Sequence, residues 1–346
     1  METRGYAVLE AKKPLQPFTF QRRSLRDGDI VFDIKFAGIC HSDIHQAREE
    51  WGGAIFPMVP GHEIVGIVTE IGTKVTKFKV GDTVGVGVFI DSCRSCDNCL
   101  AGEQQYCENG MTGTYNGLER DGTTVAMGGY SNKYVIDQDY ALVIPNSLDL
   151  SGVAPLLCAG ITLYSPLRHW NAGPGKKVGI IGLGGLGHMG VKFAAAMGAE
   201  VTVFSHSASK EADAKRMGAT HFVVTKDPEV FEELTETFDL ILNTVSAEIE
   251  IEQYLNLLKI NGTVVVIGLP GKPYEVSAFT LLRLRRSLAG SMIGGLPEIQ
   301  EMLNFCAEKN IVSDVEVIKA DYINEAYDRT VASDVKYRFV IDATTF

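Results

Sequence analysis

The segment Lys177-Val-Gly-Ile-Ile181-Gly182-Leu-Gly-Gly-Leu-Gly187 decides the fold of the central part of the chain. Its first five residues form an apolar run typical of a buried strand, and residues 182–187 fit the pattern G-x-G-x-x-G. An apolar helix is expected next, over Met189–Met197. Glycines in this pattern permit a sharp turn and let the backbone approach a pyrophosphate, whose charge the helix amides favour. The segment therefore predicts a dinucleotide-binding unit, with a glycine-rich turn that binds nothing as the alternative.

Strands and helices alternate around this segment from about residue 152. Further strands are predicted at Val201–Phe204, Phe222–Val224, Asp239–Asn243, Thr263–Gly268 and Ala289–Ile293. Helices are predicted from about Ser209, near Ile249–Lys259 and over Pro297–Lys309. Strict alternation predicts a parallel, doubly wound sheet, which places this part of the chain in the α/β class.

The first 150 or so residues have a different pattern, with short β-branched or alternating runs between glycine-containing turns. Examples are Ile30–Phe36, Ile64–Ile71 and Thr83–Val88. This part predicts a mostly-β domain. The tail that follows the last predicted helix and ends at Phe346 is predicted to be β-rich. We assign it to the first domain.

Charge and hydropathy exclude several classes of function. The chain has 346 residues, too many for one hydrophobic core, and a formal charge of −11 from 32 basic and 43 acidic residues. Such a charge disfavours a nucleic-acid partner, and the densest basic run, Arg283–Arg286, is short. We find no signal core and no run of about 18 apolar residues, so we expect a cytosolic protein without a membrane partner. Cysteines in that compartment stay reduced.

The end of the second predicted strand indicates which nucleotide is bound. An NAD-type fold places an acid about 20 residues after the glycine pattern, on the ribose hydroxyls. Here residues 203–210 read Val-Phe-Ser-His-Ser-Ala-Ser-Lys, and the first acid is Glu211. Ser205, Ser207 and Lys210 offer donors to a 2′-phosphate, which favours NADP over NAD. The alternative is that these residues only cap the next helix.

Four cysteines lie within fifteen residues of a turn-rich stretch, namely Cys93, Cys96, Cys99 and Cys107. This spacing lets a loop surround a tetrahedral ion with four thiolates, which predicts a closed, structural zinc site. Two disulfides are disfavoured by a reducing cytosol, and an iron–sulfur cluster by the lack of any other sign of electron transfer. A zinc ribbon that reads nucleic acid is disfavoured by the net charge.

Three cysteines lie outside that stretch. Cys306 lies on the apolar face of a predicted helix and is expected to be a core thiol. Cys40 begins the segment Cys-His-Ser-Asp-Ile-His45, and His62 lies in Gly-His-Glu63. Two thiolates and one imidazole would suit a zinc site that keeps a place for substrate. Spacing alone leaves it open whether Cys40, His62 and Cys158 form that set.

With these motifs the chain resembles the zinc-dependent medium-chain alcohol dehydrogenases, in particular their cinnamyl alcohol dehydrogenase-like, NADP-dependent branch. The resemblance spans nearly the whole chain. It rests on the pattern Gly61-His-Glu-x-x-Gly66-x5-Gly72, the four-cysteine lobe at about 91–110, Cys158-Ala-Gly-Ile-Thr162, the glycine pattern and Tyr337-Arg-Phe-Val340. It implies a GroES-like catalytic domain formed by 1–151 and 290–346, and a Rossmann domain formed by 152–289.

The resemblance also implies the roles of individual residues. Cys40, His62 and Cys158 would hold a catalytic zinc, with Glu63 able to take the fourth place, and Asp43 would orient His62. The four-cysteine lobe would hold a second, structural zinc. The cofactor would contact Gly182, Gly184, Gly185, Leu186, Gly187, Thr162 and Ser291, with His41 and Arg338 as further candidates near its pyrophosphate.

The activity implied is hydride transfer between a primary alcohol and NADP, with zinc as the Lewis acid. Ser42 would take the alcohol proton, which would pass by the nicotinamide ribose to His45, since imidazole titrates near a pKa of about 6.5. Gly113 and Met292 replace two aromatic residues of the plant enzymes' substrate pocket, so we expect a broad range of aliphatic and aromatic aldehydes.

The sequence leaves alternatives open. A zinc enzyme of the same fold that acts on polyols or secondary alcohols is the nearest. A zinc-free quinone or enone reductase is a second alternative, but such an enzyme would lack the metal ligands. The non-enzymatic alternative is a zinc-ribbon binding module. We expect a homodimer, with a tetramer as the other possibility.

Overall fold

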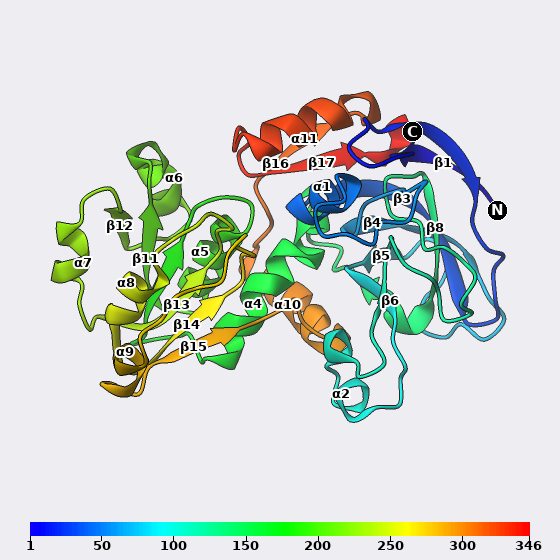
Figure 1. The fold of residues 1–346 in the computed structure, drawn as a ribbon. Helices are drawn as coiled ribbons and strands as arrows, with labels where there is room; N and C mark the ends of the chain where they lie inside the picture. The colour runs from blue at the N-terminus through cyan, green and yellow to red at the C-terminus, as the bar shows by residue number, and fades with distance from the viewer. The chain divides into compact units, whose positions relative to one another are not determined.

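The computed structural model describes residues 1–346 and divides the chain into two compact units (Figure 1). Unit 1 comprises Met1–Ile161 and Gly294–Phe346, and unit 2 comprises Thr162–Ile293. The first boundary lies ten residues beyond the predicted one. The reason is that the segment Leu150–Leu157 contacts the sheet of unit 1, where Leu157 packs against Gly85.

Unit 2 contains a six-stranded sheet in which all neighbouring strands are parallel, so the predicted doubly wound sheet is confirmed. The strand order is β12-β11-β10-β13-β14-β15, typical of dinucleotide-binding domains. The strands are β10 (Lys177–Ile181), β11 (Glu200–Ser205), β12 (His221–Val224), β13 (Phe238–Asn243), β14 (Leu258–Val266) and β15 (Ser287–Gly290). Their apolar runs are continuous because helices cover both faces.

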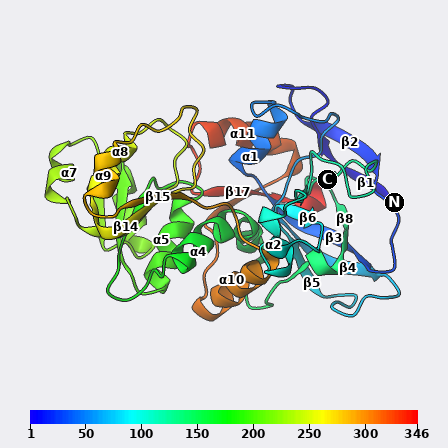
Figure 2. The same ribbon diagram turned by 60° about the horizontal axis from the view of Figure 1, so that its bottom comes forward.

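The helices of unit 2 cover the two faces with different apolar residues. Ile181, Phe204 and Ile241 belong to one core cluster with residues of α8, whereas Ile180 lies next to Gly190 of α5 on the opposite face. Figure 2 shows α4 and α5 apart from α8 and α9 across the sheet. The helices are α4 (Ala159–His169, shared with unit 1), α5 (Gly187–Ala196), α6 (Glu211–Arg216), α7 (Glu229–Glu233), α8 (Ile251–Asn256) and α9 (Ala278–Leu282).

Several predicted elements of unit 2 have different bounds in the structure, among them the strand expected at Ala289–Ile293, which is β15 at Ser287–Gly290. The helix expected near Ile249–Lys259 ends at Asn256, and β14 begins at Leu258, where the strand is extended by pairing with Phe238 across an irregularity. The helix expected from about Ser209 begins at Glu211, after one 3₁₀ turn at Ala208–Lys210.

Unit 1 is built on a seven-stranded, mostly antiparallel sheet in the order β16-β17-β3-β4-β5-β9, with β8 paired to β3. The expectation of a mostly-β domain is met by β3 (Asp29–Gly38), β4 (Ile64–Ile71), β5 (Thr83–Val86), β8 (Lys133–Asp137), β9 (Leu142–Val143), β16 (Val315–Ile318) and β17 (Arg338–Asp342). The strand pairs β1 (Glu2–Ala7) with β2 (Gln16–Gln21) and β6 (Phe89–Asp91) with β7 (Thr112–Gly113) lie outside this sheet.

Helices of unit 1 follow from their apolar spacing. In α10 (Leu296–Lys309) the buried residues are Ile299, Met302, Leu303 and Cys306, one face of a helix, so Cys306 is a core thiol as predicted. The tail is less β-rich than expected, because α11 (Ile323–Val331) lies between its two strands. The remaining short helices are α1 (His41–Ala47), α2 (Asp97–Leu100) and α3 (Leu150–Val153).

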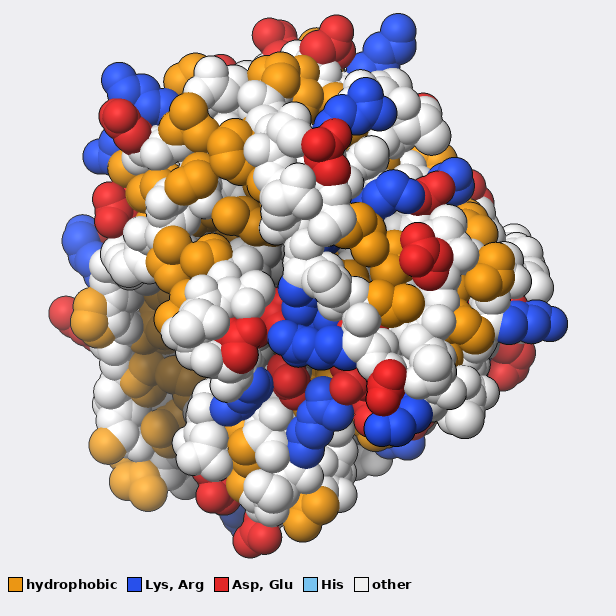
Figure 3. Space-filling view, turned by 90° about the vertical axis from the view of Figure 1, so that its right-hand side faces the viewer, with side chains coloured by type: hydrophobic (Ala, Val, Ile, Leu, Met, Phe, Trp, Pro, Cys, Tyr) orange, Lys and Arg blue, Asp and Glu red, His pale blue; other side chains and the backbone are white.

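No single helix has the length and apolarity of a membrane span, and only the bent pair Leu150–Leu157 and Ala159–His169 meets both criteria together. The face of the molecule in Figure 3 mixes basic and acidic side chains instead of gathering one sign. In unit 1, for example, Arg23 pairs with Asp29 and Glu119, and Arg94 pairs with Asp91 and Asp137.

Candidate active site

Unit 1 brings four potential metal ligands together at the end of its sheet. Cys40 precedes α1, His62 and Glu63 directly precede β4, and Cys158 lies between a 3₁₀ turn and α4. The ligand atoms of these residues all lie within 4.8 Å of one another. His62 and Glu63 are buried at 3% and 0% exposure. The structure thus unites Cys40, His62 and Cys158, which spacing alone left undecided.

The donor set fits a zinc ion. Two thiolates, one imidazole and one carboxylate are ligands that zinc takes in tetrahedral geometry. Glu63 Oε1 accepts a hydrogen bond from Arg338 at 2.6 Å, but its second oxygen, Oε2, is buried and has no hydrogen-bond partner. A buried carboxylate oxygen without a partner is costly, and a cation beside it would remove that cost.

Electrostatics in the cluster also favour metal binding. A hydrogen bond from Cys158 and the nearby His62 lower the pKa of Cys40 well below its ordinary value. Burial opposes a charged His62, but the carboxylate of Asp43 and the sulfur of Cys40 raise the pKa of His62 well above its ordinary value. Burial raises the pKa of Glu63 to about 7, against the effect of Arg338. A divalent cation would balance the anionic sulfur and carboxylate groups gathered here.

Arg338 has a partner that the sequence did not indicate. We expected this residue near the cofactor pyrophosphate, but in unit 1 its guanidinium is buried, pairs with Glu63 and donates to the carbonyl oxygen of Ile39 at 2.7 Å. The ion pair joins β17 to the residue before β4. In this arrangement Arg338 supports the metal-ligand cluster.

Asp43 is the centre of the hydrogen bonds around His62. Its Oδ1 accepts from His62 Nδ1 at 3.0 Å and from the amide of Gly61 at 3.1 Å. Its Oδ2 accepts from the amide of Cys40 at 2.9 Å, which completes the cap of α1. Because Nδ1 of His62 is held by this carboxylate, Nε2 is the nitrogen left for a metal.

The first turns of α1 carry the residues expected for proton transfer. Ser42 Oγ lies 3.7 Å from Cys40 Sγ, so this hydroxyl is beside the ligand cluster. His45 follows three residues later, stacks on Trp51 with ring centroids 4.9 Å apart and bonds through Nδ1 to Glu50. His41 is exposed at the start of the helix.

The four-cysteine lobe has the geometry of a closed metal site. The sulfurs of Cys93, Cys96, Cys99 and Cys107 all lie within 4.8 Å of one another. Cys93 Sγ and Cys99 Sγ are 3.8 Å apart, and a tetrahedral zinc with bonds of about 2.3 Å spaces two sulfurs in this way. Hydrogen bonds from the amides of Ser95 and Cys96 contribute to lowering the pKa of Cys93 to about 5, which favours the thiolate.

In unit 2 the glycine loop joins β10 to α5 in a tight turn. Gly182 has a φ of +90°, and a Cβ on Gly187 would lie 2.0 Å from the carbonyl oxygen of Gly182, so neither position accepts a side chain. A Cβ on Gly184 would meet nothing within 4 Å, which leaves the loop open toward a ligand. This shape fits a pyrophosphate at the start of the ten-residue helix α5.

The residues expected at a 2′-phosphate follow β11. Ser205 ends the strand, Ser207 bonds to Ser209 at 2.7 Å, and Lys210 Nζ donates to the carbonyl oxygen of Leu183 in the glycine loop at 2.9 Å. Ser207 precedes the 3₁₀ turn but makes no side-chain capping bond. The helix-capping alternative therefore does not describe Ser207. Glu211, the first acid, is exposed.

The other expected contact residues lie in both units. Thr162 is on α4 and Ser291 follows β15, both in unit 2, as does Met292, which is 44% exposed. Gly113 is in unit 1 on β7, where it pairs with Phe89. A Cβ on Gly113 would touch only the carbonyl oxygen of Tyr115, at 3.1 Å.

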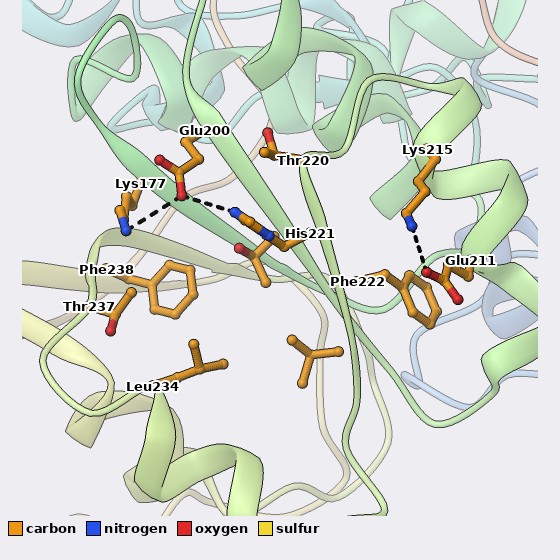
Figure 4. A pocket seen from close by; sticks show the side chains of 12 residues that line it. Lys177, Glu200, Glu211, Lys215, Thr220, His221, Phe222, Leu234, Thr237 and Phe238 are labelled. Carbon is orange, nitrogen blue, oxygen red and sulfur yellow. Dashed lines mark hydrogen bonds and ion pairs between the residues drawn. The ribbon is translucent and has the colours of Figure 1, made fainter.

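A separate hollow of about 470 Å³ lies at the amino ends of the strands of unit 2, the edge opposite the glycine loop (Figure 4). Glu200 binds both Lys177 and His221 there, at 3.4 and 3.1 Å, and Lys215 binds Glu211 at 2.8 Å. Because these charged groups are paired with one another, this hollow adds no reactive group to the site.

Sequence reasoning missed the tyrosines around Asp43. Tyr130 donates to Asp43 Oδ2 at 3.1 Å, Tyr327 donates to the Tyr130 hydroxyl at 3.5 Å, and Tyr115 stacks on His62. The only local signal is the Gly-Gly pair before Tyr130, which permits a close approach of two backbone segments.

Comparisons with known proteins agree with this geometry. Residues 26–146 match the alcohol dehydrogenase GroES-like domain, and residues 185–308 match the zinc-binding dehydrogenase family. The chain is 60% identical over 342 residues to NADP-dependent alcohol dehydrogenase C 1 of Mycolicibacterium smegmatis. The match covers 99% of this chain and 98% of that protein.

Solved structures show the same similarity over the whole chain. A cinnamyl alcohol dehydrogenase from Sorghum bicolor superposes with a TM-score of 0.96 at 44% identity, over 99% of this chain and 98% of that one. The cinnamyl alcohol dehydrogenase of Helicobacter pylori, solved with NADP(H), gives 0.93 at 42% identity over 99% of both chains. The chain therefore belongs to the zinc-binding alcohol dehydrogenases with a GroES-like domain and a Rossmann-type domain, a family of oxidoreductases.

Proposed function

We propose that this enzyme interconverts primary alcohols and aldehydes by hydride transfer with NADP(H), at a zinc held by Cys40, His62 and Cys158. The observation that carries the proposal is the set of two sulfurs, one imidazole and one carboxylate within 4.8 Å of one another, of which all but Cys40 are buried. Three protein ligands with a replaceable fourth are typical of a catalytic zinc. Glu63, whose buried Oε2 has no hydrogen-bond partner, would supply the fourth ligand when no substrate is bound.

Each protein group in unit 1 has a defined task. Asp43 fixes the ring of His62, and Arg338 holds Glu63 at the edge of the ligand set. When bound, zinc supplies Lewis-acid polarisation of the substrate oxygen, and NADP(H) supplies or accepts the hydride. Ser42, beside Cys40, receives the alcohol proton during oxidation, and His45 exchanges it with solvent.

We predict that His45→Ala slows alcohol oxidation more at about pH 6.5 than at about pH 9, because hydroxide replaces the imidazole as proton acceptor at high pH. Nδ1 of His45 is held by Glu50, so Nε2 is the nitrogen that exchanges protons. The measurement is kcat for oxidation of a primary alcohol across this range, beside the wild type. His221→Ala, a change at an exposed histidine of unit 2, is the control. An equal loss at both pH values would remove His45 from the proton path.

NADP rather than NAD is supported by the absence of an acid between Ser205 and Lys210. We assign the 2′-phosphate to Ser205, Ser207 and Lys210, and the pyrophosphate to the loop formed by Gly182, Gly184, Gly185, Leu186 and Gly187. A relative at 60% identity is named for its NADP dependence. Thr162 and Ser291 are assigned to the cofactor as well, and His41 remains a candidate at its pyrophosphate.

Gly113 and Met292 support a broad substrate range, because a glycine and a flexible thioether stand where the resemblance implies two aromatic residues. Unit 1 is assigned as the catalytic domain and unit 2 as the nucleotide-binding domain. We further assign a structural zinc to the four-cysteine lobe, which makes two zinc ions per chain.

A cytosolic homodimer is the form we propose for this enzyme. The edge strand β15 has pairing groups free on one side of the sheet, and Phe279 and Leu282, on the preceding helix, are 70% and 76% exposed. A second copy of the chain would cover these apolar side chains.

The proposal is tested by steady-state reduction of an aldehyde series with NADPH and NADH. We expect kcat/KM to rise from acetaldehyde to hexanal and benzaldehyde, and to be about tenfold or more higher with NADPH than with NADH. A preference for NADH would contradict the assignment of Lys210 and the serines. Activity with polyols and none with aldehydes would contradict the substrate class.

A further inference from the structure

We propose that Tyr130 is a positioning residue for the metal-ligand set, acting through Asp43, with Tyr327 supporting its hydroxyl group. The proposal rests on the proposed function, because it concerns the zinc site formed by Cys40, His62 and Cys158. The Tyr130 hydroxyl bonds to Asp43 and Tyr327, and not to Cys40, His62 or Cys158. Its role is to hold the carboxylate that orients His62 and closes the cap of α1.

The backbone around Tyr130 is paired directly to the segment that leads into His62. Amides of residues 128, 129 and 130 donate to the carbonyl oxygens of residues 59, 61 and 60, at 2.7, 2.8 and 2.9 Å. A Cβ on Gly61 would lie 2.6 Å from the ring of Tyr130, so the ring lies on the backbone immediately before His62. Gly61 has a φ of +104°, and glycine at this position permits both the turn and the contact.

The hydroxyl of Tyr130 completes the partners of a fully buried carboxylate. Asp43 is 0% exposed and accepts four hydrogen bonds, from the amides of Cys40 and Gly61, from His62 and from Tyr130. Three of these donors belong to ligand residues or to the residue beside one. Tyr130 donates from outside the two ligand segments, and the buried Tyr115 hydroxyl also interacts with Asp43 from outside them. Oδ2 of Asp43 is thus held from two sides, by the amide of Cys40 and by the Tyr130 hydroxyl, and loss of the hydroxyl leaves it a single partner.

Tyr327 sets the direction in which the Tyr130 hydroxyl points. It lies on α11, is 5% exposed, and its hydroxyl donates to the oxygen of Tyr130 at 3.5 Å. Because that oxygen already accepts from Tyr327, the Tyr130 proton is directed to Asp43. The rings of the two tyrosines meet edge to face, with centroids 6.4 Å apart. Helix α11, from the end of the chain, is thus connected to the ligand set by two hydroxyl groups.

The test is the rate at which the Cys40 site loses zinc to a colorimetric chelator, for Tyr130→Phe beside the wild type. Phenylalanine keeps the ring on Gly61 and removes only the hydroxyl. We expect zinc release from this site to be about tenfold faster, the lower end of the effect of partners of metal ligands. Release from the four-cysteine site should be unchanged, which serves as an internal reference.

Tyr134→Phe is the matched control. Tyr134 is also buried, at 1% exposure, but its hydroxyl donates to the carbonyl oxygen of Thr114 and not to Asp43. With cobalt in place of zinc, the visible spectrum of the Cys40 site should shift in Tyr130→Phe and not in Tyr134→Phe. Equal release rates and equal cobalt spectra in the two variants would overturn the proposal, since removal of any buried hydroxyl would then have the same effect.

Tyr327→Phe decides the matter if Tyr130→Phe does not fold. This variant leaves the Asp43 hydrogen bond in place but removes the group that directs it, so a smaller acceleration of zinc release from the same site is expected. Zinc release from Tyr327→Phe at the wild-type rate would overturn the proposal. The zinc content of the wild-type protein is measured before any variant is compared. A wild type that holds zinc only in the four-cysteine lobe would contradict the proposed function itself.

Discussion

Cys158→Ala is expected to lower kcat/KM for aldehyde reduction about a thousandfold or more, and to remove one zinc ion per chain. Lewis-acid catalysis by a metal is worth several kcal/mol, and about 4 kcal/mol corresponds to three orders of magnitude in rate. Alanine removes one of the two thiolates of the set and leaves Cys40 without its sulfur partner in a buried pocket. Zinc content and NADPH oxidation, measured on the same preparation, give both quantities.

Cys306→Ala is the matched control for this variant. Cys306 is also a buried cysteine of unit 1, but it lies on α10 with its sulfur 3.6 Å from that of Met302, away from both ligand sets. It should keep the wild-type zinc content and kcat/KM. A Cys158→Ala protein that kept full zinc and most of its activity would show that this cysteine is no ligand.

Cys99→Ala is expected to have the largest effect on stability. Cys99 is buried in the four-cysteine lobe, and its loss should release the structural zinc, whose binding contributes to folding. The lobe also supports α10, because the side-chain oxygen of Gln104 accepts the amide of Leu296 at 3.0 Å at the start of that helix. We expect the free energy of unfolding to fall by about 4 kcal/mol or more, since loss of a metal belongs to the most damaging changes.

The measurements for Cys99→Ala are thermal unfolding and zinc content, with Leu100→Ala as the control. Leu100 is the next residue of the lobe and is 72% exposed, so its replacement should change stability little. Any folded Cys99→Ala protein should still hold the zinc of the Cys40 site and reduce aldehydes. Unchanged stability with two zinc ions per chain would contradict a structural role for the lobe.

Features written in short stretches of sequence could be predicted. The glycine pattern and the strand before it lie within eleven residues, and both β10 and the start of α5 are found where the pattern places them. The four thiols of the lobe are likewise close in the sequence and close in space. In such cases the spacing itself restricts the geometry, because a short loop has few ways to bring its side chains together.

Long-range contacts could not be predicted from the sequence. Cys158 reaches Cys40 and His62 only because the 3₁₀ turn before it packs on the sheet of unit 1, and no spacing rule describes that contact. Arg338 pairs with Glu63, 275 positions away, a contact that no local pattern indicates; the resemblance alone placed this arginine near the cofactor. Helix α11 was missed because the whole tail was interpreted as β-rich, although Ile323, Ala326, Tyr327 and Thr330 form one buried helical face.

The most direct test of the central claim is to remove zinc stepwise from the wild-type protein with a chelator and to follow aldehyde reduction by NADPH. We predict two zinc ions per chain at the start. Activity should fall in proportion to loss of the zinc at Cys40, His62 and Cys158, and added Zn²⁺ should restore it. Undiminished turnover after that zinc has been removed would contradict the account.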